Sequence, residues 1–295
     1  MNHKIGLALG GGGARGSFQL GVVKALRDLG VLEQILYVSG TSIGAINTLM
    51  IMNGLSDKRM LEIWNKIDNS GIYGDGPDRF KEDKQGIFSL QDLYDLVKKE
   101  LSISEIKESK IHGFATTTKI PKESLIDQVI FSRMEKKVFY LNDMKDPTQG
   151  ALASASMPIL FGPSNIKDDY YIDGGVKDNC PVQPLIEQGC DIVIAVPVHY
   201  GLRPKKYRDS NILLIGIEPH YLFNPFMTDV VNFDPKEIPH RIEYGVMLTE
   251  FVFNKLQEQN LFDKKNSTWY KPKDYRYIRI SRDEEIKLKF LGKDN

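Results

Sequence analysis

Ser42 stands between two glycines at the junction of two apolar runs, in the pattern Gly40-x-Ser42-x-Gly44. Residues 34–38 are β-branched and aromatic, as in a buried strand, and residues 43–52 have the length and apolar character of a helix. A serine at such a tight turn projects its hydroxyl group next to a helix N-terminus, which favours developing negative charge. The pattern predicts a nucleophile that attacks esters; the alternative is a glycine-punctuated turn whose serine only caps a helix.

A run of four glycines follows the apolar residues 5–9 and continues as Ala-Arg-Gly. Such a backbone lies close to its partner, with N–H groups free to point at an anion or a developing one. A dinucleotide fingerprint would use Gly11, Gly13 and Gly16, but the next strand does not end in the acidic residue that holds a ribose. A Walker loop would need a Gly-Lys-Ser/Thr sequence, which is missing here.

The remaining interpretation of this loop is an oxyanion hole. In it the N–H groups of Gly12 and Gly13, with Gly11 beside them, converge on the carbonyl oxygen that Ser42 attacks. Arg15 adds positive charge or braces the loop against a carboxylate. The alternative for Arg15 is a solvated arginine at the start of a helix.

Asp173 ends an aromatic run at 170–172 and is followed by Gly174 and Gly175. An aspartate in a tight turn at a strand end can face a cleft. If it meets Ser42, and if burial raises its proton affinity, it can act as the general base. The alternative is an ordinary Asp-Gly turn of the kind found in hairpins.

A serine hydrolase of the Ser-His-Asp type would use a histidine as its base. An α/β-hydrolase places that histidine late in the chain, so the candidates would be His199, His220 and His240. None of them has glycine neighbours or a sharply turned context, and the glycine loop comes too early for that fold. A Ser42–Asp173 dyad therefore fits better. An esterase with a histidine base stays open, as does a non-catalytic lipid-binding protein on the same scaffold.

Strands and helices alternate along the chain, which predicts an α/β fold whose central sheet is mostly parallel, with helices on its faces. The runs at 192–196 and 212–217 are continuous and apolar, as in strands buried on both faces. The predicted strands are 5–9, 35–38, 111–118, 138–141, 170–172, 192–196, 212–217 and 275–280. The predicted helices are 17–29, 43–52, 55–67, 89–101, 150–161 and 242–257, and the small residues of 150–161 predict close packing against the floor of the site.

Composition narrows the classes of function. The 39 basic and 39 acidic residues give a net charge of zero, so the chain has no overall field that would gather nucleic acid. Two cysteines are too few for a disulfide framework and have no metal-ligand spacing, which favours a reducing cytoplasmic setting. No apolar run is long enough to span a bilayer. We expect a single domain over residues 1–295, with a catalytic core at about 5–198 and a strand and helix extension at about 199–295.

The glycine loop, the Gly-x-Ser-x-Gly turn and the Asp-Gly-Gly turn, taken in this order, resemble the patatin-like phospholipase (lipid acyl hydrolase) family of the bacterial type. The small-residue stretch before Asp173 adds to the resemblance, which covers roughly residues 5 to 198. It implies a three-layer α/β/α sandwich, a Ser42–Asp173 dyad, and hydrolysis of acyl esters of phospholipids or related lipids through an acyl-enzyme. It implies no metal. We expect no cofactor, and a lipid or acyl-ester substrate, with transient contact with a membrane surface as an option.

Three segments have no assigned role at this point. Residues 69–86 are rich in glycine and charge and are expected to form a loop at the mouth of the sheet. Residues 203–208 are the densest basic patch, read as a solvated loop or as a site for phosphate headgroups. The apolar residues 221–227 are read as core packing or as a lid that contacts a membrane. The sequence carries no signal for the oligomeric state.

Overall fold

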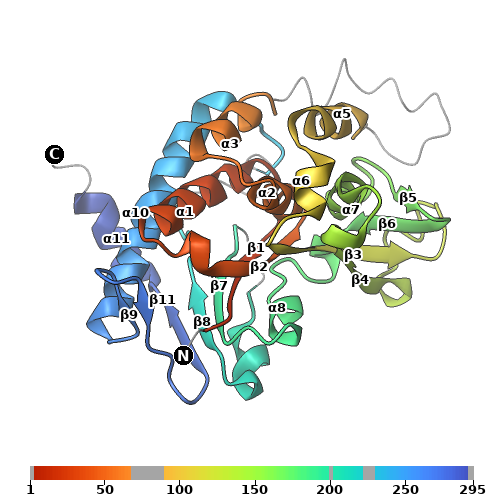
Figure 1. Ribbon diagram of the computed structural model, residues 1–295. Coiled ribbons are helices and arrows are strands. Elements are labelled where there is room, and N and C mark those ends of the chain that lie inside the picture. The colour runs from red at the N-terminus through yellow and green to blue at the C-terminus, as the bar shows by residue number, and fades with distance from the viewer. Residues whose placement is uncertain (1–2, 68–89, 199–201, 222–229, 292–295) are drawn as a thin grey trace.

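The computed structural model describes residues 3–67, 90–198, 202–221 and 230–291 (Figure 1). The expected loop at 69–86 and nearly all of the apolar stretch at 221–227 lie outside these residues, as does His199. Within the described ranges, no helix combines the length and the apolar character needed to cross a bilayer.

Nine of the described strands form one mixed sheet in the order β11-β8-β7-β1-β2-β3-β6-β5, with β4 paired to β3. The strands from β11 to β3 run parallel, and β4, β5 and β6 are antiparallel to their neighbours. Their bounds are β1 (Ile5–Leu9), β2 (Ile35–Thr41), β3 (His112–Ile120), β4 (Glu135–Tyr140), β5 (Ser164–Ile166), β6 (Asp169–Asp173), β7 (Ile192–Val196), β8 (Leu213–Gly216) and β11 (Arg276–Arg279). A small hairpin joins β9 (Phe262–Asp263) and β10 (Thr268–Trp269).

Helices cover both faces of the sheet, as the predicted three-layer fold requires (Figure 1). Their bounds are α1 (Ser17–Asp28), α2 (Ile43–Met52), α3 (Asp57–Trp64), α5 (Gln91–Glu100), α6 (Ile103–Lys107), α7 (Pro147–Ser154), α8 (Gln183–Glu187), α10 (Ile238–Glu258) and α11 (Arg282–Leu291). Alternation along the strands divides the core in two. In β7, Ile192 and Ile194 belong to the large cluster on the side of α1, α2 and α10, while Val193 and Ala195 belong to the smaller cluster on the side of α8.

The two longest helices of the helical layer, α1 and α10, cross in close contact. A Cβ atom on Gly21 of α1 would lie 2.0 Å from the carbonyl oxygen of Ile242, and one on Gly245 of α10 would lie 2.3 Å from that of Phe18. Only glycine permits backbones to approach this closely. The crossing holds α10 against α1, the helix that follows the glycine loop.

The structure corrects the prediction for residues 150–161. The helix, α7, begins earlier because Asp146 caps it and Pro147 occupies its first turn, and it ends at Ser154. The helix cannot continue regularly because Pro158, four residues after Ser154, has no N–H to donate to the Ser154 carbonyl oxygen. The carbonyl oxygen of Ser156 instead accepts the N–H of Asp173 (2.8 Å). The stretch after Ser154 is therefore an irregular segment that joins the helix to the strand carrying Asp173.

The C-terminal region is more regular than its charged sequence indicated. The charged tail ends in α11, which the sequence analysis did not predict, and the basic stretch at 203–208 falls in a 3-10 helix, Pro204–Ser210. Tyr207 of that helix is buried in the cluster beside α8, and the exposed lysines lie around it. Strands β8 and β11, both after residue 198, belong to the central sheet.

Candidate active site

Ser42 lies at the turn between β2 and α2, in a backbone conformation with φ 56° and ψ −127°. A positive φ is rare for residues other than glycine and costs energy, so the surrounding structure must hold it in place. Ser42 is the N-cap residue of α2, yet its side chain makes no capping hydrogen bond. The structure therefore does not favour the idle capping serine, because the hydroxyl group is directed elsewhere.

The two glycines of the turn are required by close contacts. A Cβ atom at Gly40 would lie 2.3 Å from the carbonyl oxygen of Gly44, and one at Gly44 would lie 2.2 Å from that of Leu9. These contacts are with backbone atoms, which cannot move aside without disturbing the strands. The glycines thus let the turn close tightly over the end of β1.

Ser154, at the end of α7, holds the backbone of Ser42. Its Oγ accepts the N–H of Ser42 (2.8 Å) and donates a hydrogen bond to the carbonyl oxygen of Thr116 on β3. The three groups are buried, so each of these polar atoms needs a partner within the protein. The small-residue stretch therefore does reach the site, as expected, through a serine rather than through alanine packing alone.

Asp173, the last residue of β6, is buried next to Ser42, whose hydroxyl group lowers the pKa of the Asp173 carboxyl. The carboxylate of Asp173 accepts the N–H of Gly175 (2.7 Å), and its backbone oxygen accepts the hydroxyl of Thr118 (3.0 Å). Burial raises the pKa of Asp173 to about 6, against the opposing effect of Ser42 and Gly175. The structure thus brings together the serine and the aspartate that the sequence analysis paired.

The turn after Asp173 is fixed by its glycines. A Cβ atom at Gly174 would lie 2.0 Å from the carbonyl oxygen of Thr116, and one at Gly175 would lie 2.7 Å from Oδ1 of Asn179. The chain continues as a short 3-10 helix, Gly174–Val176, rather than as a hairpin. The Asp-Gly pair therefore seats the carboxylate next to β3.

The glycine loop packs directly on Ser42. A Cβ atom at Gly11 would lie 3.0 Å from Cβ of Ser42. The N–H of Gly11 is already donated to the carbonyl oxygen of Asn179 (3.0 Å). Among the described residues, the N–H groups of Gly12 and Gly13 have no hydrogen-bond acceptor. The three candidate oxyanion donors are therefore reduced to two.

Gly13 has a φ of 53°, and a Cβ atom there would lie 2.0 Å from the carbonyl oxygen of Val230. That oxygen accepts the N–H of Ala14 (3.0 Å), so the backbone of Val230 packs on the glycine loop and holds it in place. A Cβ atom at Gly16 would lie 2.6 Å from Ile43, which follows Ser42. Arg15 is buried, with only 4% of its surface exposed, which contradicts the alternative of a solvated arginine.

Four side chains hold the ends of the glycine loop, and all but Gln19 are distant from it in sequence. Asn179 donates to the carbonyl oxygen of Gly11 (3.1 Å), which makes its contact with Gly11 reciprocal. Arg241 of α10 donates to the carbonyl oxygen of Ala14 (2.9 Å). The side-chain amide of Gln19 donates to the carbonyl oxygen of Gly10 (2.7 Å). The side-chain amide of Asn47 donates to the carbonyl oxygen of Gly16 (3.1 Å) and to Oε1 of Gln19 (2.8 Å).

These holding residues were missed by the sequence analysis. Asn179 lies six residues after Asp173, and an asparagine next to a predicted catalytic turn is the kind of signal that could have been noticed. Arg241 has no local signal, because only the crossing of α10 over α1 brings it to the loop. Ser154 was recognised only as a small residue.

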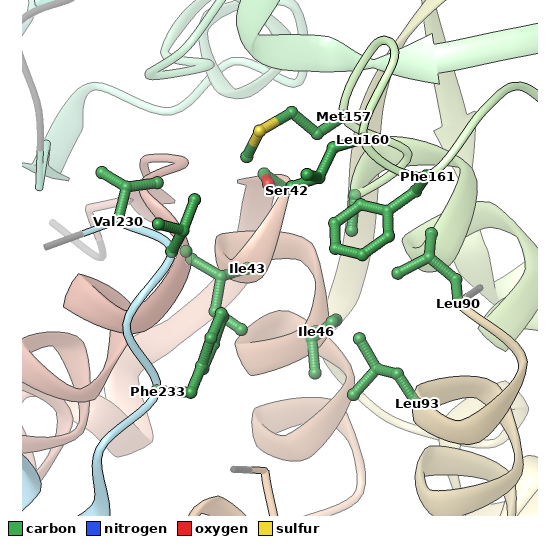
Figure 2. A pocket seen from close by; sticks show the side chains of 13 residues that line it. Ser42, Ile43, Ile46, Leu90, Leu93, Met157, Leu160, Phe161, Val230 and Phe233 are labelled. Atoms are coloured by element: carbon green, nitrogen blue, oxygen red, sulfur yellow. The ribbon is translucent and has the colours of Figure 1, made fainter. Parts of the chain in front are cut away.

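A narrow cleft opens at Ser42 and runs along α2 (Figure 2). Figure 2 shows Ser42 at the end of the cleft nearest Met157 and Leu160, with Ile43 and Ile46 of α2 leading away from it. The remaining side chains come from α5, from the segment after α7, and from residues that precede α10. Apart from Gly13 and Ser42, the lining residues are apolar: Ile43, Ile46, Leu90, Leu93, Ala155, Met157, Leu160, Phe161, Val230, Val231 and Phe233.

The described histidines contact groups other than Ser42 or are exposed to solvent. His220 contacts the carbonyl oxygen of Glu218 (2.7 Å) and the carboxylate of Glu285 (3.1 Å), and His240 is exposed on α10. His3 contacts Asp191, and His112 contacts Tyr140. No described histidine lines the cleft or bonds to Ser42. Among the described residues, the geometry favours the aspartate over His220 and His240 as the partner of the serine.

Comparison with known proteins decides the family. The sequence model described as "Patatin-like phospholipase" matches residues 7–186, a stretch that includes the glycine loop, Ser42 and Asp173. The chain belongs to the patatin-like phospholipase family. The mixed, mostly parallel sheet flanked by helices is the fold expected from that membership.

Curated relatives of this patatin-like chain are lipid hydrolases by name. It is 30% identical over 219 residues to "Lysophospholipase NTE1" of Yarrowia lipolytica, a match that covers 70% of this chain and 14% of that protein. It is 25% identical over 241 residues to "Probable lipid hydrolase 463L" of Invertebrate iridescent virus 6, covering 74% of this chain and 80% of the viral protein. The chain thus spans about a seventh of the length of the fungal relative.

Among solved structures, this patatin-like chain is similar to VipD from Legionella pneumophila, with a TM-score of 0.46, 16% identity, and coverage of 86% of this chain and 67% of that one. It is also similar to the type III effector protein ExoU, with a TM-score of 0.49, 16% identity, and coverage of 88% and 54%.

Proposed function

We propose that this chain is a serine lipid acyl hydrolase, a phospholipase A or esterase that cleaves acyl esters of phospholipids or related lipids. The observation that carries the proposal is the proximity of the Ser42 hydroxyl to the buried carboxylate of Asp173, at the end of an apolar cleft. The family membership supports the same class of substrate.

In the proposed reaction, Asp173 takes the proton of the Ser42 hydroxyl as Oγ attacks the ester carbonyl carbon. The N–H groups of Gly12 and Gly13 stabilise the oxyanion that forms, aided by the N-terminus of α2. The tetrahedral intermediate expels the alcohol, which receives the proton from Asp173, and leaves an acyl group on Ser42. Asp173 then draws a proton from water as it attacks the acyl-enzyme, which releases the fatty acid and restores the serine.

The pKa of Asp173 suits both parts of this cycle. At neutral pH a carboxyl group with a pKa of about 6 is mostly ionised and can accept the serine proton. It is also more basic than a solvent-exposed aspartate, because burial penalises its charged form. A base close to the working pH gives the best combination of protonation state and proton-transfer strength.

The cleft is suited to an acyl chain. Its lining is apolar along the direction that leads away from Ser42, and each methylene group removed from water there contributes about 0.8 kcal/mol. We therefore assign the cleft to the acyl part of the substrate and leave the alcohol part outside it.

We also infer that residues before and after 198 form one catalytic unit. Arg241, Val230 and Phe233, which follow residue 198, hold the glycine loop or line the cleft. Strands β8 and β11 extend the same sheet. This arrangement supports a single domain in which the C-terminal extension helps to build the site.

The test is hydrolysis of soluble p-nitrophenyl butyrate and of lysophosphatidylcholine by the wild type and by Ser42→Ala, with Ser104→Ala as a matched control. Ser104 is exposed on α6, and its hydroxyl group bonds to that of Ser102, which is not part of the site. We expect the wild type and Ser104→Ala to hydrolyse the substrates equally, and Ser42→Ala to lose turnover by a factor of about 10⁴ or more. Retention of turnover by Ser42→Ala would remove the basis of the proposal.

A further inference from the structure

The segment between β3 and β4 reverses the usual distribution of side chains. Its polar residues Asp127 and Gln128 are buried, whereas the neighbouring Leu125, Ile126 and Val129 are more than half exposed. Ile126, at 63%, is the most exposed large apolar side chain in the described part of the protein. Soluble proteins bury such residues, and an exposed cluster of them marks a contact surface.

This reversal is fixed by hydrogen bonds and is not a loose loop. The carboxylate of Asp127 accepts the hydroxyl of Ser124 (2.8 Å) and is paired with Arg133 (3.3 Å). Oε1 of Gln128 accepts the backbone N–H of Ile159 (2.8 Å). Because these bonds hold the side chains of Asp127 and Gln128 inward, the apolar side chains on either side of this pair must face outward.

The exposed apolar residues continue to the wall of the cleft. Ile159 is itself 47% exposed and has a φ of 67°, and it lies between Met157 and Leu160, which line the cleft beside Ser42. Five of the seven exposed large apolar residues in the described ranges belong to this one surface. We call it the apolar rim, and it consists of Leu125, Ile126, Val129, Phe131 and Ile159.

Lysines lie beside the apolar rim. Residues 119–137 contain five lysines or arginines, of which Lys119, Arg133 and Lys136 are paired with aspartates, whereas Lys122 and Lys137 are exposed. Lys177, four residues after Asp173, lies 3.5 Å from the ring centroid of Phe131 and donates to its carbonyl oxygen (2.9 Å). Exposed apolar side chains with lysines beside them match a lipid interface, where the apolar side chains enter the acyl boundary and the cations meet phosphate groups.

We propose that the apolar rim is the surface by which this protein docks on a phospholipid bilayer, and that docking presents the acyl ester to the cleft at Ser42. The proposal rests on the lipid hydrolase function proposed above. The rim carries no catalytic group. Its role is to bring the mouth of the cleft to the lipid surface, so it governs turnover of vesicle-borne substrate and leaves turnover of a soluble ester unaffected.

The first experiment compares vesicle binding by the wild type and by the double variant Ile126→Asn/Val129→Asn. The vesicles contain phosphatidylcholine and phosphatidylglycerol, and binding is measured by co-sedimentation. Both residues are exposed, so the fold should tolerate the change. The matched control is Leu36→Asn, because Leu36 is 46% exposed but lies at the start of β2, at the opposite end of that strand from Ser42.

We expect the double variant to bind vesicles at least tenfold more weakly and to hydrolyse vesicle phospholipid correspondingly more slowly. Hydrolysis of p-nitrophenyl butyrate should stay at the wild-type rate in the double variant and in Leu36→Asn. Wild-type vesicle binding by the double variant would overturn the docking surface. Failure of the wild type to hydrolyse the soluble ester would instead overturn the proposed function, so the two failures are distinguishable.

The second experiment locates the contact directly. The chain has two tryptophans, Trp64 and Trp269, and both are buried. In Ile126→Trp, brominated phosphatidylcholine in the vesicles should quench the fluorescence of the new side chain, whereas Leu36→Trp should show no added quenching. Equal quenching in both variants would contradict the proposal. A concentration-dependent dimer that Ile126→Asn/Val129→Asn abolishes, while vesicle binding persists, would contradict it too, because the apolar rim would then bind a second copy of the chain.

Discussion

Replacement of Asp173 by asparagine should stabilise the protein at neutral pH while it removes the proposed base. Burial raises the pKa of Asp173 from its ordinary value of 3.8 to about 6. The folded protein therefore binds this proton more tightly than the unfolded chain, and ionisation of the group opposes folding. Asparagine has nearly the same shape and carries no charge at any pH.

The magnitude follows from the difference between the two pKa values. It corresponds to about 3 kcal/mol of unfolding free energy once the group is ionised in both states. Below about pH 3 the carboxyl group is largely protonated in both states and the penalty is nearly absent. The penalty grows as the pH rises from about 3 to 6 and is complete above about 7. For a chain of this length, 3 kcal/mol corresponds to an increase of roughly 5 °C in Tm.

The assay is thermal unfolding of the wild type and Asp173→Asn at pH 4, 5, 6 and 8. We expect the Tm of the variant to exceed that of the wild type at pH 8 and the difference to shrink as the pH falls. The matched control is Asp169→Asn on the same strand. The Lys119 ammonium group beside Asp169 lowers the pKa of that exposed carboxylate, so its removal should give no stabilisation. A gain at Asp173 that does not depend on pH, or a loss at pH 8, would refute the reasoning.

Three further predictions concern the reaction and the residues that hold the site. For a soluble ester, kcat/KM should rise with pH through an apparent pKa of about 6 and level off above it, because Asp173 must be ionised to accept the serine proton; a profile that falls over this range would exclude it as the base. Ser154→Ala leaves the buried N–H of Ser42 without its acceptor. We therefore expect denaturant titration to show a loss of about 1–3 kcal/mol in unfolding free energy, and kinetics to show a reduced kcat. An unchanged kcat would show that Ser154 does not position the serine. Ile46→Trp fills the cleft, so kcat/KM for p-nitrophenyl laurate should fall about tenfold or more relative to the butyrate; equal effects on both esters would place the acyl chain elsewhere.

Local patterns in the sequence predicted the strand before Ser42 and the helix after it, whereas the pairing of Ser42 with Asp173 also rested on the resemblance to the patatin-like family. The turns at Ser42 and Asp173 could be recognised because Gly40, Gly44 and Gly174 stand where a Cβ atom would collide with backbone, so these positions require glycine in the sequence. The same reasoning predicted the buried parallel strands from their continuous apolar runs.

Contacts between distant segments could not be predicted in this way. Arg241 reaches Ala14 across 227 positions, and Asn179 reaches Gly11 across 168, and each depends on how whole elements cross. The bond from the N–H of Asp173 to the carbonyl oxygen of Ser156, just after the end of α7, also joins two separate segments and was missed. The outward-facing residues around Ile126 likewise read as ordinary apolar sequence until the burial of Asp127 and Gln128 is known.

The most direct test of the central claim is intact-mass spectrometry after exposure to a fluorophosphonate, followed by mapping of the modified peptide. The account predicts one adduct per chain on the peptide that contains Ser42, no adduct in Ser42→Ala, and strongly slowed labelling in Asp173→Asn. An adduct on a different serine, or labelling of Ser42 that is as fast in Asp173→Asn as in the wild type, would contradict a serine activated by this aspartate.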